Sequence, residues 1–156
     1  MVEVVHGDLL GQNVDVIVNS WNRNFIPWWL LIPQGVSGAI KRGAGFQPFR
    51  ELARKGTLKA GEAVITSPGR LNYKAIIHVA ALNCFWLSSE SIVQKCTSNA
   101  LAIAAEHGFD SIAMPLFGAG TGGLDPSRCL SVIQAACKGS HYRGLIRIII
   151  YTPAIE

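Results

Sequence analysis

The chain has 156 residues and a formal charge of +4, and 49% of its residues are hydrophobic against 15% charged. This length and apolar content suit one globular domain over residues 1–156 and exclude a disordered chain. The positive excess favours anionic partners, but its Lys and Arg residues are scattered without a basic stripe, so an extended nucleic-acid surface is not expected.

Short segments rich in Val and Ile alternate along the chain with longer amphipathic segments. Strands are predicted at residues 2–6, 14–19, 62–67, 75–79, 111–114 and 145–151. Several of these strands are apolar on both faces, which is typical of central strands that helices cover. The alternation predicts a layered α/β domain with a mostly parallel or mixed sheet.

Helices are predicted at residues 37–55 with a break near Gln47-Pro48, at 88–107 and at 126–138. Ser88 or Ser89 can cap the start of the second helix, and Asp125 can cap the start of the third. Gly108 and Gly139 follow the ends of these two helices, as is common at helix C-termini.

No charged leader precedes the first strand, and the longest apolar stretch, residues 25–33, is too short to span a bilayer. A soluble cytoplasmic protein is therefore expected. The cysteines form no C-x-x-C pair and are expected to be reduced and mostly buried; they are Cys84, Cys96, Cys129 and Cys137. Neither they nor the four histidines show zinc-ligand spacing, so no metal or cofactor is predicted.

One glycine-rich segment follows the fifth predicted strand and precedes a predicted helix: Gly118-Ala119-Gly120-Thr121-Gly122-Gly123. Ligands of open α/β sheets bind outside the carboxyl ends of the strands, where glycine lets backbone N–H groups approach phosphate oxygens. The segment therefore predicts a phosphate or diphosphate cradle, the alternative being a flexible turn. No G-K-[ST] follows, so a P-loop nucleotide triphosphatase is not supported.

A second glycine-bearing segment, Gly35-Val36-Ser37-Gly38, opens the first predicted helix. Two such loops can face each other and hold a diphosphate between their backbone amides, one of them at a helix N-terminus. The alternative is that Ser37 caps the helix and the glycines serve packing.

Polar residues stand where the first two strands end. Asp8 can accept a hydrogen bond from an exocyclic amine such as adenine N6, or it can be an ordinary turn residue. Asn19 and Asn22 would present neutral amides that suit hydroxyl-rich sugars, although Asn19 can instead stabilise the bend. His78, inside an apolar strand, is expected to be a core histidine with satisfied hydrogen bonds.

These segments occur in the order and approximate spacing of macro domains, and the chain resembles that family over nearly its whole length. The resemblance is carried by Gly7-Asp8-Leu9, by residues 14–22, 35–40, 61–66 and 76–79, and by residues 115–123. It implies a three-layer α/β/α sandwich with a mixed six-stranded sheet, and ADP-ribose or an ADP-ribosylated substrate as the partner.

The resemblance also implies roles for single residues. Asp8 would bind adenine N6, and Leu9 would offer a backbone amide. Tyr151 would stack on the adenine, unless it is only a strand-end residue with a wet hydroxyl. Residues 35–38 and 118–122 would hold the diphosphate and the distal ribose, and Asn22 would reach that ribose.

The chain departs from the family pattern where hydrolysis would occur. Macro domains with hydrolase activity usually carry glycines followed by an Asp, whereas here Ser37 stands in the acidic position. The inserted residues 23–31 include Trp28-Trp29, which could cap the sugar or pack as a hydrophobic flap. The expected function is hydrolysis of ADP-ribose linkages on protein or in O-acetyl-ADP-ribose, with Asn22 and Ser37 as candidate catalytic residues. A non-catalytic ADP-ribose reader is the alternative.

Overall fold

The computed structural model describes residues 1–21, 35–83, 87–119 and 122–151, with the backbone alone for residues 35–38. Its six strands form one sheet in the order β1-β6-β5-β2-β4-β3. Only β3 runs antiparallel to its neighbour, β4; the other neighbouring strands are parallel. The strand bounds are Val2–Gly7, Val16–Ser20, Ala63–Thr66, Ala75–Val79, Ser111–Pro115 and Leu145–Tyr151 for β1 to β6.

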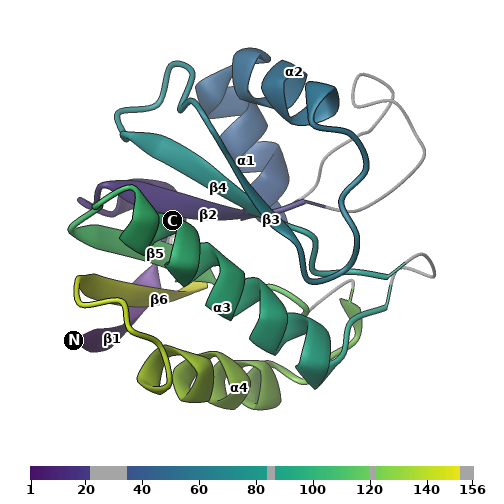
Figure 1. The fold of residues 1–156 in the computed structure, drawn as a ribbon, viewed down its shortest axis with the longest axis vertical. Helices are drawn as coiled ribbons and strands as arrows, with labels where there is room; N and C mark the ends of the chain where they lie inside the picture. Colours follow the sequence, from purple (N-terminus) through teal and green to yellow (C-terminus); the bar gives the residue numbers. More distant parts are fainter. Residues whose placement is uncertain (22–34, 84–86, 120–121, 152–156) are drawn as a thin grey trace, which may run out of the picture.

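Helices cover both faces of the sheet (Figure 1). Helices α1, Gly35–Ala44, and α2, Gln47–Arg54, lie on one face. Helices α3, Glu90–Glu106, and α4, Pro126–Lys138, lie side by side on the other. A short 3-10 helix, Leu9–Gly11, follows β1. The predicted three-layer α/β/α sandwich with a mixed six-stranded sheet is thus confirmed.

The core consists of two clusters, one on each side of the sheet. Val16 and Val18 of β2 pack on the α3 and α4 side, while Ile17 of β2 packs with Phe49 and Leu52 of α2. Successive side chains of a strand point to opposite faces, so a strand that is apolar throughout must be covered on both. The prediction of buried central strands is confirmed.

Some element ends differ from the predictions. The first helix breaks at Gly45, which has φ +80°, and Gln47-Pro48 instead begins α2. Proline fits the first turn of a helix because its missing N–H would have no partner there. Strand β2 begins at Val16 rather than Val14.

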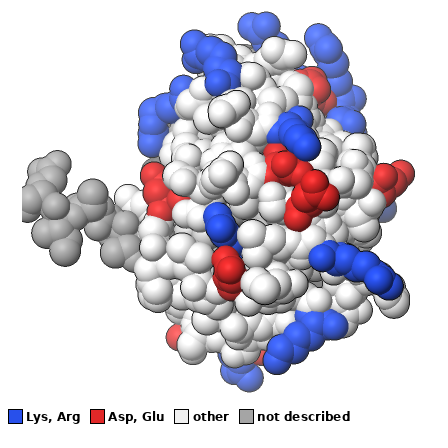
Figure 2. Space-filling view, turned by 90° about the vertical axis from the view of Figure 1, so that its left-hand side faces the viewer, with Lys and Arg blue, Asp and Glu red and all other residues white. Residues whose placement is uncertain are grey.

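The described surface and thiols agree with the expectations from composition. On the face drawn in Figure 2, Lys and Arg are spread out with acidic residues between them, without a continuous basic stripe. The three cysteines that the structure describes are buried and free; Cys84 lies outside the described residues. In the described part of the chain, no helix is long and apolar enough to cross a membrane.

Candidate ligand-binding site at the carboxyl ends of the strands

Strands β2 and β5 part near their carboxyl ends. Their last pairing is Ile17 with Ala113, whereas β2 stays paired with β4 as far as Ser20 and Val79. Beyond β2 the chain enters α1 on one face of the sheet, and beyond β5 it enters α4 on the other (Figure 1). This is the topological switch point at which open α/β sheets bind ligands, and "switch point" below means the region beyond Ile17 and Ala113.

The glycine-rich segment follows β5 at the switch point. Gly118 and Gly123 have φ angles of +93° and +76°, in the left-handed region that favours glycine. The N–H of Leu124 donates to the carbonyl of Gly118 at 3.2 Å, and Ala119 forms a bridge with Leu124. The segment therefore folds back on itself as a closed loop. Its residues Gly120 and Thr121 lie outside the described part of the chain.

The loop lies tightly against the segment that precedes α3 and against α3 itself. A Cβ atom on Gly118 would lie 2.7 Å from Cγ2 of Val93 and 2.9 Å from Oγ of Ser88. A Cβ atom on Gly122 would lie 2.9 Å from both Leu82 and Ser88 side-chain carbons. The N–H of Ser88 also donates to the Gly122 carbonyl at 3.0 Å. A side chain therefore lacks room at both positions, and at Gly118 the φ angle favours glycine as well.

A buried thiol of α4 also supports the start of the loop. The Cys129 thiol lies 2.8 Å from the Phe117 carbonyl oxygen and donates to it. Burial raises the pKa of Cys129 to about 11, so the thiol keeps the proton that this contact needs. The described part of the loop is therefore held by specific contacts with α4, with α3 and with the segment before α3, which a flexible turn would lack.

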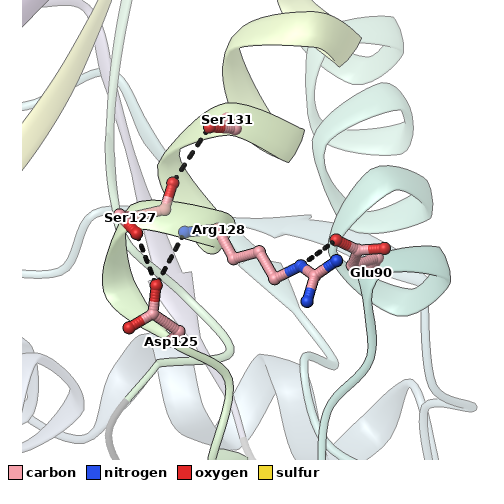
Figure 3. Close-up of polar contacts among 5 residues, drawn as sticks. All are labelled: Glu90, Asp125, Ser127, Arg128 and Ser131. Carbon is pink, nitrogen blue, oxygen red and sulfur yellow. Dashed lines mark hydrogen bonds and ion pairs between the residues drawn. The ribbon is translucent and has the colours of Figure 1, made fainter.

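The start of α4 uses its own cap. Asp125 accepts hydrogen bonds from the Arg128 N–H at 3.2 Å and from the Ser127 hydroxyl (Figure 3). These bonds, that of Ser127 first, lower the pKa of Asp125. Arg128 reaches across to Glu90 at the start of α3, with Nε 2.8 Å from Oε1. The predicted cap is confirmed, and it occupies N–H groups that an anion would otherwise bind.

Residues 35–38 form the first turn of α1, so the helix that they open begins two residues earlier than the predicted start at residue 37. Their backbone N–H groups belong to the turn that has no partners within the helix, which leaves a role in diphosphate binding as a prediction. The side chains of Val36 and Ser37 lie outside what the structure describes, as do Asn22, Trp28 and Trp29.

Asp8 and Tyr151 lie beside each other at the far edge of the sheet, because Gly7 pairs with Tyr151. Asp8 is exposed, and its Oδ1 accepts from the Leu10 N–H at 3.0 Å, which caps the 3-10 helix. Tyr151 is 65% exposed. Leu9 is buried. Asp8 is thus a turn residue, as its alternative interpretation held, and the adenine contacts of all three residues stay predictions.

Asn19 is completely buried in the structure, and the expectation that its amide is presented to a ligand cleft stays a prediction. Its Nδ2 lies 2.9 Å from Nδ1 of His78, and Nε2 of His78 lies 2.8 Å from Oγ1 of Thr66. Burial, together with the charge of Lys55, lowers the pKa of His78 to about 3. His78 is therefore a neutral core histidine with both ring nitrogens bonded, as predicted.

Two buried polar atoms near the switch point have no hydrogen-bond partner among the described residues: Oδ1 of Asn19 and Oγ of Ser88. Neither Thr66 nor Ser88 was predicted as a site residue. The signal for Thr66 was present, because Thr66, His78 and Asn19 are polar interruptions in three apolar strands. No cluster of potential metal ligands occurs in the described part of the chain.

Known proteins are similar to this chain in sequence and in fold. The model of the family described as Macro domain matches residues 18–133. An O-acetyl-ADP-ribose deacetylase of Enterobacter cloacae is 35% identical over 139 residues, which cover 84% of this chain and 73% of the relative. A macro domain-containing protein of Listeria monocytogenes is 40% identical over 131 residues, 79% of this chain and 70% of the relative.

Solved structures agree with these matches. A variant of the Oceanobacillus iheyensis macrodomain with ADPR has a TM-score of 0.81 and 27% identity, covering 97% of this chain and 85% of that one. The macrodomain of Mycobacterium tuberculosis DarG shares the fold at a TM-score of 0.77 and 22% identity, covering 99% of both chains. From the family match and these relatives, this chain belongs to the macro domain family.

Proposed function

We propose that the protein binds ADP-ribose along the carboxyl ends of β1, β6, β5 and β2 and hydrolyses ADP-ribose linkages, such as that of O-acetyl-ADP-ribose. The order of groups along this edge carries the proposal. Asp8 and Tyr151 lie at the β1 and β6 end, the glycine-rich loop follows β5, and Asn19 lies in β2. Three strand spacings separate β1 from β2, about 14 Å, so the ligand is extended, with a base at one end and a sugar at the other.

Each part of the ligand then has a partner of suitable chemistry. The Asp8 carboxylate accepts from adenine N6, and the Tyr151 ring stacks on the base. Backbone N–H groups of the loop at residues 118–122 and of the first turn of α1 bind the diphosphate. Asn22 reaches the distal ribose. The deacetylase name of one relative and the ADPR complex of one neighbour support this ligand.

In the proposed reaction the site holds a water molecule against the anomeric carbon of the distal ribose, near Asn22. Where the ester is on the anomeric carbon, as in an ADP-ribosylated carboxylate side chain, the new bond joins the water oxygen to that carbon, the bond to the acyl oxygen breaks and the carboxylate leaves. Where the acetyl ester is on another ribose hydroxyl, the water instead adds to the acetyl carbonyl carbon, the bond from that carbon to the ribose oxygen breaks, and acetate leaves. Ser37 stands where an acid is expected, so the proton passes to a substrate phosphate oxygen or through a water on Ser37. His78 does not replace the missing base, because both its ring nitrogens are hydrogen-bonded in the core.

Calorimetry with ADP-ribose tests the ligand and its orientation. Asp8→Ala is expected to weaken binding by about tenfold, the effect of one hydrogen bond to a charged group. Asp8→Asn is the matched control for folding, since its carbonyl oxygen can still accept from the Leu10 N–H. Affinity in Asp8→Ala equal to that of the wild type would contradict the adenine assignment.

Turnover is tested separately on O-acetyl-ADP-ribose and on ADP-ribosylated protein. We expect release of free ADP-ribose above the buffer rate, and a larger loss of kcat than of affinity in Asn22→Ala. Binding without release in the wild type would favour a reader, the second candidate, for which Ser37 in the acidic position is the supporting observation.

We also infer that the protein works in the cytoplasm. The support is that Cys96, Cys129 and Cys137 are free thiols, since reducing compartments keep thiols unpaired.

A further inference from the structure

Asn19, His78 and Thr66 form a chain of buried hydrogen bonds beside the switch point. Their exposed fractions are 0%, 0% and 5%. The three residues come from β2, β4 and β3, on the face of the sheet that α1 and α2 cover, and the Phe49 ring of α2 lies 5.8 Å from the His78 ring in an edge contact. All three side chains are thus part of the core, and the Asn19 end lies in β2 beside the switch point.

The hydrogen bonds of this chain run in one direction. The Thr66 hydroxyl donates its single hydrogen to the Ser67 carbonyl, 3.1 Å away, so it can only accept from Nε2 of His78 at 2.8 Å. The ring proton is therefore on Nε2. Nδ1 carries the lone pair and accepts from Nδ2 of Asn19 at 2.9 Å.

This order fixes the orientation of the Asn19 amide. Its nitrogen is bound to His78 on the β4 side, and the two arms of a planar amide diverge. The carbonyl oxygen Oδ1 therefore points away from His78, toward the β5 side of β2. At this height β2 has no paired residue on β5, because the pairing of the two strands ends at Ile17 and Ala113. Oδ1 has no partner among the described residues, and such buried polar atoms call for an explanation in a native fold.

The chemistry of Oδ1 restricts its partner. A carbonyl oxygen only accepts hydrogen bonds, and ionised phosphate oxygens only accept them too, so the diphosphate cannot satisfy it. A hydroxyl can. Under the proposed function the adenine end of the ligand lies at β1, three strands away, and the hydroxyls that come to β2 are those of the distal ribose.

We propose that Thr66 and His78 are positioning residues: they hold the Asn19 amide with its carbonyl oxygen toward the ligand, where it accepts a hydrogen bond from a hydroxyl of the distal ribose. This inference rests on the proposed function for its ligand. The buried residues Thr66 of β3 and His78 of β4 would then help the site to distinguish ADP-ribose from ADP, which lacks the distal ribose.

Thr66→Val tests the chain at its remote end, because it removes the hydroxyl and leaves the size of the side chain nearly unchanged. His78 then loses the acceptor for its Nε2 proton, and the ring can carry its proton on Nδ1 while the Asn19 amide turns over. Thr66→Ser is the matched control, since it keeps the hydroxyl.

Calorimetry compares ADP-ribose with ADP, which lacks the distal ribose. Thr66→Val is expected to bind ADP-ribose about tenfold more weakly and ADP within about twofold of the wild type. Thr66→Ser is expected to stay within about twofold for both ligands. An equal loss for the two ligands in Thr66→Val, or no loss for either, overturns the inference while leaving ADP-ribose binding in place.

The histidine proton provides a readout that needs no variant. Nitrogen-15 NMR of the wild-type protein is expected to show His78 protonated on Nε2, and a proton on Nδ1 overturns the inference even if Thr66→Val does not fold. A wild-type protein that binds ADP but gains no affinity from the distal ribose overturns the ribose contact. If the wild type binds neither ligand, the proposed function fails, and the ligand half of the inference fails with it.

Discussion

On the β5 side of the switch point, packing holds the glycine-rich loop: Val93 and Ser88 leave no room for a side chain on Gly118. On the β2 side, the hydrogen bond that Asn19 donates to His78 holds the Asn19 amide, and His78 is held in turn by its bond to Thr66. On the β5 side, added side-chain atoms should lower the free energy of unfolding, whereas a change of protonation should not affect it. The β2 side should be sensitive to the loss or gain of a single proton. The two sides of the site are thus held differently: close packing fixes the glycine-rich loop, and the direction of the hydrogen bonds fixes the Asn19 amide.

The largest expected effect is the acid sensitivity of the β2 side. The pKa of His78 is about 3 in the folded protein and about 6.5 in an unfolded chain. Between these values the unfolded state binds the extra proton, so stability is lost as pH falls from about 6.5 toward about 3, by roughly 4 kcal/mol. Denaturant unfolding across this range measures it.

The matched variant for this prediction is His78→Gln. A glutamine can accept from Asn19 and donate to Thr66 but does not titrate, so its free energy of unfolding should fall less steeply over the same pH range. A slope equal to that of the wild type would show that His78 is not the sensitive group.

The second effect tests the β5 side. Gly118→Ala combines a left-handed φ of +93° with a Cβ contact of 2.7 Å to Val93, and it should reduce the free energy of unfolding by about 3 kcal/mol. Gly123→Ala is the control, because its φ is +76° but nothing lies within 4 Å of the new Cβ. It should cost about 1 kcal/mol. Equal losses in the two variants would mean that packing against Val93 and Ser88 does not fix the loop.

The smallest effect concerns two neighbouring serines. Oγ of Ser88 is buried without a partner among the described residues, so Ser88→Ala should leave stability unchanged or raise it by up to about 1 kcal/mol. Ser89 caps α3 by accepting from the Ile92 N–H at 3.2 Å, and Ser89→Ala should cost about 1 kcal/mol. Thermal unfolding of both variants measures the difference. A loss in Ser88→Ala as large as that in Ser89→Ala would reveal a hydrogen bond that the Ser88 hydroxyl makes in solution.

The sequence alone predicted the layered fold and the place of the loop. The Val and Ile segments located all six strands, and Asp125-Pro126 marked the start of α4, because these signals act within a few residues of where they occur. The glycines of residues 118–123 were assigned to the end of a strand before a helix, and the structure has Gly118, Gly122 and Gly123 between β5 and α4. The helix break at Gly45 was misplaced, because Pro48 is compatible with the first turn of a helix as well as with a break.

The tertiary structure decided which polar residues meet. Asn19 pairs with His78 across 59 positions of the chain, and Ser88 lies under Gly118 and Gly122 from a segment about 30 positions earlier in the chain. Periodicity in a sequence shows which face of a strand a residue occupies, but strand order and register determine its neighbour there. Only the assembled sheet therefore determines the burial of Asn19, the direction of its amide and the close packing of the loop. The positions of the strands, the helix caps and the glycine-rich segment could be predicted from the sequence, because each depends on residues close together in the chain.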